Sequence, residues 1–325
     1  MIDRLLVLGY HNVADTPAFP LGGQEGIDGF RAQVRFLARA ARPYTVGDAL
    51  DRLARGAPLG PRAVALTFDD GYADNVTLAA EVLAHHGVPA TFFCVPEFLD
   101  GAARPWWERL AWACLAARRS EVTVEGERIP LGDEAQRRAA RRRISAHLLP
   151  LRHDERLRRL EALVAELDPA GEDPSARLMT DWDGARRLAA TGFEIGSHSL
   201  RHARLANEPA DVQAADLAAA RRRLQEGTGR PVPVLAYPHG TAADFDDHSR
   251  AAAAAAGHTH AVTTISGWVD RRGARDRRFD VPRIMVSPSD GVPALARAVA
   301  SAGRARLRHL RARVGARTGP GASTP

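Results

Sequence analysis

Short apolar runs alternate with amphipathic segments along most of the chain. The amphipathic segments repeat their apolar residues about every three or four positions, as a helix does, whereas the apolar runs have the length of strands. The apolar runs lie at residues 5–11, 63–68, 90–95, 193–197, 234–237, 260–264 and 281–286, and the helical patterns at residues 30–41, 75–86, 182–190, 211–226 and 247–256. This alternation is typical of parallel βα units.

The run at residues 63–68 is apolar at nearly every position instead of at every second one. Such a strand is buried on both faces, as in a parallel sheet that helices cover. With about seven strands of this kind, a closed or nearly closed barrel is favoured. We therefore predict an α/β fold with a (β/α) barrel, and an open sheet is the alternative that periodicity leaves.

Residues 103–177 interrupt the alternation. They are rich in arginine and helical in pattern, with one strand-like patch at residues 122–124. We interpret them as a helical insertion in one domain that spans residues 1–299. The adjacent Trp106 and Trp107 have two interpretations, because paired tryptophans either build a core or, when exposed, form a lid or platform on which a substrate stacks.

Residues 300–325 form a basic C-terminal tail that ends in glycine, proline and serine. One interpretation is a helix that frays at its end. The other is a peripheral contact with an anionic membrane surface, since arginine-rich segments are attracted to such surfaces.

Composition narrows the class of protein. Of 325 residues, 45% are hydrophobic and 26% charged, which excludes wholesale disorder and permits a sizeable core. All 45 basic residues are arginine and the net charge is only +6, so we expect no nucleic-acid partner.

Cys94 and Cys114 are too few for a disulfide framework. No signal-peptide pattern or long apolar span is present, and we expect a cytoplasmic protein.

Two adjacent carboxylates, Asp69 and Asp70, follow the strand at residues 63–68 and precede a glycine. Barrel enzymes place their active sites at this end of a strand, where neighbouring side chains can point in different directions. One carboxylate could bind a metal ion while the other handles a proton. The alternative is an ordinary Asp-Gly turn.

His198 and His202 follow another apolar run and are four residues apart. At that spacing two imidazoles can reach one cation, although such pairs also occur as surface neighbours. Together with a carboxylate from the other strand they would make a three-ligand metal site with open positions for water and substrate.

The segments around these residues resemble the polysaccharide deacetylases, the carbohydrate esterase family that includes the chitooligosaccharide deacetylases. The similar segments are residues 8–13, 67–72, 87–93, 198–202 and 236–240. The resemblance extends from Tyr10 to about Ile284 and leaves residues 103–177 outside.

This resemblance implies a distorted (β/α) barrel that uses a divalent metal ion, commonly zinc, to hydrolyse an acetyl group from a sugar. It implies Asp70, His198 and His202 as metal ligands and Asp69 as the general base. A cation held by one carboxylate and two neutral imidazoles keeps a net positive charge, which lowers the pKa of bound water from ~16 toward ~7. We add the backbone N–H of Tyr237 as an oxyanion donor, because it lies at a turn.

The chain departs from the family's commonest pattern in its third motif. Many members have an arginine two residues before the proline of this motif, where the present chain has Ala236. That arginine orients the base, and we predict Arg283 as its substitute. The alternative is an ordinary arginine at a strand edge.

A second departure concerns the acid that protonates the leaving group. Many members supply a histidine from a late strand, but none follows Val281 here except in the tail. A branch of the family that acts on exopolysaccharides resembles this chain in its early Tyr-His pair. We therefore predict His11, which follows a strand, as the acid. His239, His258 and His260 are the alternatives.

Our first functional hypothesis is a metal-dependent hydrolase that removes an acetyl group from an N-acetylated or O-acetylated sugar or glycan precursor. The second is a catalytically degenerate carbohydrate-binding or scaffolding protein of the same fold. A third keeps the enzyme but assigns a non-sugar amide. The complete set of Asp69, Asp70, His198 and His202 favours an enzyme, because a binding protein does not need all four.

Overall fold

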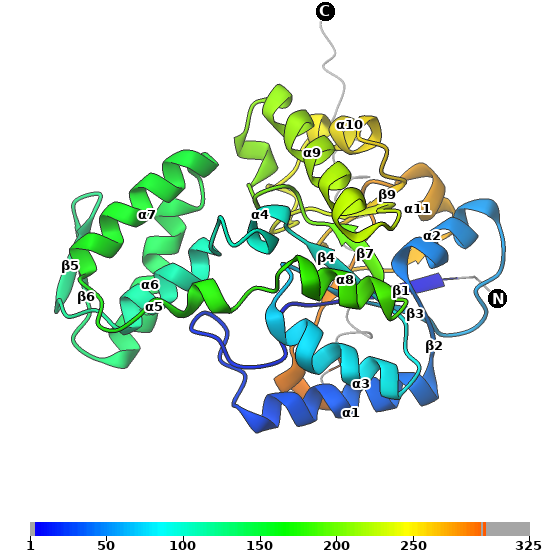
Figure 1. The fold of residues 1–325 in the computed structure, drawn as a ribbon, viewed down its shortest axis with the longest axis horizontal. Helices are drawn as coiled ribbons and strands as arrows, with labels where there is room; N and C mark the ends of the chain where they lie inside the picture. Colours follow the sequence, from blue (N-terminus) through cyan, green and yellow to red (C-terminus); the bar gives the residue numbers. More distant parts are fainter. Residues whose placement is uncertain (1–3, 294, 297–325) are drawn as a thin grey trace, which may run out of the picture.

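The computed structural model describes residues 4–293 and 295–296, in which helices surround a curled parallel sheet (Figure 1). The strands follow in the order β1 (Arg4–Tyr10), β3 (Ala63–Phe68), β4 (Ala90–Cys94), β7 (Glu194–Ser197), β8 (Val234–Ala236) and β9 (His260–Val262). Each strand is parallel to the next. Their carboxyl ends therefore lie at one rim of the sheet.

The chain after β9 closes the sheet. The Val281 N–H donates to the carbonyl oxygen of Ala261 in β9 (3.0 Å), and β11 (Ile284–Met285) pairs in parallel with β1. The same segment thus joins the last strand to the first, and the prediction of a distorted (β/α) barrel with about seven parallel strands is confirmed. Two further strands flank this ring: β2 (Arg42–Tyr44), parallel to β3, and β10 (Val269–Asp270), antiparallel to β1.

Helices follow most of the strands, as the alternating pattern predicts. They are α1 (Gln24–Ala40), α2 (Val46–Arg55), α3 (Ala80–His85), α4 (Pro96–Leu99), α8 (Trp182–Ala190), α9 (Ala210–Thr228), α10 (Asp247–Ala255) and α11 (Arg271–Asp276). A π-helical turn (Asn75–Ala79) leads into α3, and short 3₁₀ turns lie at Leu205–Asn207 and Pro288–Asp290. Local capping sets the start of several helices; for example, the Asp181 carboxylate accepts from the Gly184 N–H at the start of α8.

Strand β3 is buried at every position, which confirms the expectation of burial on both faces. Leu66 and Phe68 pack into one apolar cluster with Phe30 of α1. Ala63 and Ala65 belong to the cluster on the other face. Because β3 is fixed from both sides, the residues that follow it start from a rigid position.

The insertion stands to one side of the barrel and has its own apolar core (Figure 1). Its elements are α5 (Trp106–Leu115), the hairpin β5 (Glu121–Val124) and β6 (Glu127–Pro130), α6 (Glu134–Leu148), α7 (His153–Leu167) and a 3₁₀ turn (Pro174–Arg177). The buried Arg156 side chain donates to the carbonyl oxygens of Leu148 and Leu149 at the end of α6 (3.1 and 2.9 Å). This contact satisfies carbonyl groups that the end of a helix leaves without partners.

Trp106 does not form an exposed platform. Its side chain is only 5% exposed and packs in the core of the insertion. The guanidinium of Arg156 lies over its ring, 5.3 Å from the centroid. The interpretation of Trp106 as an exposed stacking residue is therefore wrong, and the core interpretation holds.

The predicted tail at residues 300–325 lies outside the described residues. Among the residues that the structure does describe, no helix is both long and apolar enough to span a bilayer.

Candidate active site

The candidate residues from distant parts of the chain meet at the carboxyl-end rim of the barrel. His11 directly follows β1, Asp69 and Asp70 follow β3, His198 follows β7, and Arg283 lies just before β11. This is the position in which parallel barrels gather functional side chains.

Asp70, His198 and His202 form a compact buried cluster. The Asp70 Oδ1 atom lies 3.3 Å from Nε2 of His198 and 3.1 Å from Nε2 of His202. One potential ligand atom from each residue lies within 4.8 Å of the others. Asp70 and His202 both have left-handed backbone conformations, with φ of 71° and 57°. Such conformations are costly for non-glycine residues and occur where the surrounding structure holds a functional geometry.

The hydrogen bonds of this cluster favour a cation. Nδ1 of His198 lies 2.8 Å from the carbonyl oxygen of Ala236. A carbonyl oxygen only accepts, so Nδ1 carries the proton, and in the neutral form of the ring the lone pair of Nε2 faces Asp70. Asp70 Oδ1 is buried and has no hydrogen-bond donor in good geometry among the described residues. A carboxylate oxygen and two imidazole nitrogens that converge in this way suit a divalent metal ion, and the residues fit one.

Burial and neighbouring charges shift the pKa values of the three cluster residues in different directions. Burial would raise the pKa of Asp70, but the nearby imidazoles of His202 and His198 together hold that pKa well below its usual value. Burial likewise opposes protonation of His198, but the charges of Asp69 and Asp70 raise its pKa overall. For His202 the effect of burial prevails and lowers the pKa. Asp70 is therefore a carboxylate at neutral pH, the form that binds cations.

Asp69 is held by Arg283. The Nη1 and Nη2 atoms of Arg283 donate to Oδ1 and Oδ2 of Asp69, both at 2.7 Å. Arg283 is fully buried, and its remaining donors reach the carbonyl oxygen of Thr263 (3.0 Å) and Oγ1 of Thr67 (3.1 Å). Burial would raise the pKa of Asp69, but the charge and hydrogen bonds of Arg283, together with the charge of His198, outweigh burial and lower the pKa. Asp69 is thus ionised and fixed in orientation.

His11 lies at the same rim and is half-buried. Its charge lowers the pKa of both Asp69 and Asp70, which places it close to the two carboxylates. The Asn75 side chain donates to the carbonyl oxygen of His11 (2.8 Å). Asp74 accepts from the N–H groups of the two residues at positions 13 and 14, at 2.8 Å each, and so fixes the loop that follows His11.

Tyr237 cannot serve as the predicted oxyanion donor. Its backbone N–H donates to the carbonyl oxygen of Val262 in sheet pairing (3.2 Å). Its side chain is buried and stacks on Phe245, with ring centroids 4.2 Å apart. The prediction for Tyr237 is wrong, because sheet pairing already uses the only backbone proton.

Of the three alternative histidines, only His239 lies beside the cluster. Its ring centroid is 5.1 Å from that of His202, and its Nε2 has no hydrogen-bond partner among the described residues. Burial lowers the pKa of His239 well below its usual value, so the ring is neutral. His260 begins β9 and His258 precedes it, so both lie toward the opposite rim.

Some contacts at the site could not be predicted from the sequence. The ring of Trp107 lies against His202, with centroids 4.5 Å apart, and its Nε1 donates to the hydroxyl oxygen of Tyr72 (2.9 Å). That hydroxyl donates to Oε1 of the buried Glu108 (2.8 Å). Trp107 and Glu108 belong to the insertion, which therefore borders the site directly.

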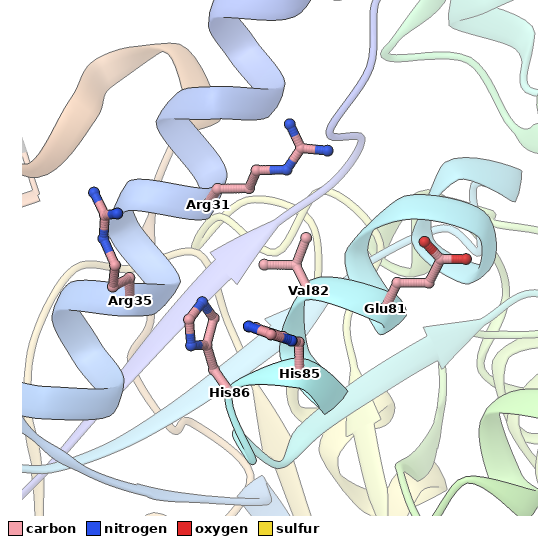
Figure 2. A pocket seen from close by; sticks show the side chains of 6 residues that line it. All are labelled: Arg31, Arg35, Glu81, Val82, His85 and His86. Atoms are coloured by element: carbon pink, nitrogen blue, oxygen red, sulfur yellow. The ribbon is translucent and has the colours of Figure 1, made fainter.

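A shallow groove of about 650 Å³ on the outside of the barrel lies between α1 and α3 (Figure 2). Its walls are formed by Arg31, Arg35, Glu81, Val82, His85 and His86. None of the predicted site residues lines this groove. The chemistry of the chain therefore lies at the rim and not in this groove.

A comparison with protein families decides the class of the chain. The family model described as polysaccharide deacetylase matches residues 56–261, more than half of the sequence. The chain belongs to the polysaccharide deacetylase family. The matched segment of this family member contains Asp69, Asp70, His198 and His202, whereas His11 and Arg283 lie outside it.

Solved structures of deacetylases share the fold. A Streptococcus pyogenes deacetylase, PplD, described in complex with acetate, superposes with a TM-score of 0.59 at 14% identity, covering 92% of this chain and 99% of that one. A de-N-acetylase from Aggregatibacter actinomycetemcomitans has a TM-score of 0.57 at 17% identity, covering 91% and 100%. IcaB from Ammonifex degensii has a TM-score of 0.56 at 19% identity, covering 91% and 97%. No curated protein matches the sequence.

Proposed function

We propose that this polysaccharide deacetylase family member is a metal-dependent hydrolase that removes an acetyl group from an N-acetylated or O-acetylated sugar or glycan precursor. The observation that carries the proposal is the buried convergence of Asp70, His198 and His202, in which one potential ligand atom from each residue lies within 4.8 Å of the others. The ionised Asp69 beside it supplies the base that hydrolysis needs.

Asp70, His198 and His202 would hold a divalent cation, and zinc suits a set of one carboxylate and two imidazoles. When bound, such an ion supplies Lewis-acid activation of water and of the acetyl carbonyl. The hydrogen bond of His198 to the carbonyl oxygen of Ala236 fixes the tautomer that leaves Nε2 free to coordinate.

Asp69 receives the proton of the attacking water, and Arg283 orients it. The two parallel hydrogen bonds from Arg283 prevent the carboxylate from rotating, and the guanidinium charge keeps it ionised before water is deprotonated. Arg283 therefore takes the place of the arginine that the third motif lacks at Ala236.

His11 donates a proton to the leaving group. A leaving amine departs poorly as an anion, so hydrolysis of an amide needs an acid near the metal ligands. His11 follows β1 at the same rim as Asp69 and Asp70, and a positive charge on it would lower the pKa of both carboxylates. His239 is half-buried as well, but burial lowers its pKa well below the usual value and leaves its ring neutral, which supports the assignment of His11.

The test is acetate release from a panel of N-acetylated and O-acetylated sugars by the zinc-loaded full chain. We expect release from at least one substrate, and a loss of both zinc and activity in His198→Ala. The exposed His85→Ala serves as the control and should retain both. Zinc binding without release from any acetylated sugar or simple acetylated amide would favour a carbohydrate-binding protein of the same fold.

A further inference from the structure

We propose that Glu108, in the first turn of α5, is a positioning residue through which the insertion fixes the rim of the active site. The proposal rests on the function proposed above. It assigns to the insertion a role in holding the loop that carries Asp70 and the loop that follows His11.

Glu108 joins the insertion to the loop that follows His11. Its carboxylate is fully buried. Oε1 accepts from Oγ1 of Thr16 (2.7 Å), and Oε2 accepts from the backbone N–H of Ala18 (2.8 Å). Both donors belong to the segment between His11 and α1, so Glu108 fixes this segment a few residues beyond the part that Asp74 holds.

Glu108 also reaches the metal-ligand cluster. Oε1 accepts from the Tyr72 hydroxyl (2.8 Å), two residues beyond Asp70. The same hydroxyl accepts from Nε1 of Trp107 (2.9 Å), whose ring lies against His202. Tyr72 thus connects Glu108 to the loop of Asp70, which follows β3. Trp107, through its ring contact, connects the same network to His202, which follows β7.

The segment that directly follows the insertion holds the same loop by its backbone. The Thr180 N–H donates to the carbonyl oxygen of Gly71 (2.9 Å), and the Ala73 N–H donates to the carbonyl oxygen of Leu178 (2.8 Å). Tyr72 and Met179 therefore form an antiparallel bridge. The loop after Asp70 is held by the insertion and by the segment that follows it, which explains how Asp70 keeps its left-handed conformation.

A purely structural contact would not need a carboxylate here. Burial raises the pKa of Glu108, and hydrogen bonds from Thr16, Ala18 and Tyr72 oppose that shift. Burying a carboxylate is costly unless its oxygens are well satisfied, and an apolar side chain would fill the same space without that cost. A fully satisfied buried network instead specifies one arrangement of the groups that it joins.

The test compares Glu108→Gln, Tyr72→Phe and the double variant in the full chain, by zinc calorimetry and by acetate release. We expect each single variant to weaken zinc binding by ~10–100-fold, as loss of groups that orient metal ligands does. Turnover should fall more than KM rises, because substrate contacts are unchanged. In the double variant the loss should be smaller than the product of the single losses, because both changes break the same hydrogen bond.

Ile144→Ala is the matched control, because Ile144 is buried in the core of the insertion but has no place in this network. It should lower thermal stability while zinc affinity and turnover per bound zinc stay at wild-type values. Should Glu108→Gln and Tyr72→Phe behave like Ile144→Ala, Glu108 would be only a core residue, and the proposal would be overturned.

One further variant and one wild-type measurement distinguish failure of this proposal from failure of the proposed function. Thr16→Val removes the hydrogen bond to Glu108 and, within the same loop, the one that Oγ1 accepts from the Phe19 N–H, and it replaces Glu108→Gln if that variant does not fold. Its expected result is a smaller loss of turnover with unchanged zinc affinity, and unchanged turnover would contradict the link to the loop after His11. A wild-type chain that binds zinc but releases no acetate refutes the proposed function alone, since zinc affinity still reports on Glu108.

Discussion

Arg283 and Asp69 are 214 positions apart in the chain, yet the guanidinium of one donates to both carboxylate oxygens of the other at 2.7 Å. The pair exists because the segment that closes the barrel lies beside the end of β3. Arg283 precedes β11, which pairs with β1, and β1 pairs with β3. The closure of the barrel and the orientation of the proposed base therefore depend on the same segment.

Arg283→Gln should reduce turnover by about 10²-fold, because Asp69 loses its fixed orientation and its ion-pair partner. It should also lower the free energy of unfolding by about 3–5 kcal/mol, since a buried carboxylate is left without its counter-charge. Metal content should stay at the wild-type level. Acetate release, urea unfolding and elemental analysis check the three parts. Arg250→Gln is the control, because Arg250 is partly exposed. Wild-type turnover in Arg283→Gln would show that the ion pair with Asp69 does not orient the base.

His11→Ala should reduce amide hydrolysis by ~10²–10⁴-fold while fold and metal content remain, because the leaving amine loses its proton donor. The loss should be smaller for ester substrates, whose alcohol leaving groups depend less on protonation. Parallel acetate assays on N-acetylated and O-acetylated sugars measure the difference. Full amidase activity in this variant would transfer the role to His239, the other histidine beside the cluster.

Trp106→Ala should lower the free energy of unfolding by about 3–5 kcal/mol, as expected when a large buried aromatic side chain is removed. Its effect on KM should be secondary, because the side chain is only 5% exposed. Denaturant unfolding and substrate kinetics on the same preparation separate the two effects. A raised KM at wild-type stability would restore the stacking role that the burial of Trp106 argues against.

The buried His258 should make the fold sensitive to acid. Burial and the nearby Arg221 lower its pKa from 6.5 to about 3. As pH falls below 6.5, the unfolded chain binds a proton that the folded chain does not, so stability is lost at up to about 1.4 kcal/mol per pH unit. Urea unfolding at pH 7.5 and pH 5 should show a smaller difference in His258→Leu than in the wild type. The exposed His248→Leu should leave the difference unchanged.

Much of the site could be predicted because it depends on strand ends. Asp70 and His198 each follow an apolar run, and parallel strands bring their carboxyl ends to one rim. Arg283 could be named because a missing arginine at Ala236 left Asp69 in need of a cation. The structure brings these residues together as the motifs imply.

Other features depend on tertiary contacts that a pattern does not contain. The N–H of Tyr237 is used by its pairing with Val262, which the register of neighbouring strands decides. Trp106 and Trp107 are adjacent, yet one packs in the insertion core and the other also reaches His202. Glu108 gave no signal, because its partners at Thr16 and Tyr72 come from distant segments.

The most direct test of the account is acetate release by the wild-type chain before chelation, after complete removal of metal, and after zinc is added back. The account predicts that chelation abolishes release and that one equivalent of zinc restores it, whereas Asp70→Asn gains nothing from added zinc. Undiminished acetate release from protein shown by elemental analysis to contain no divalent metal would contradict it.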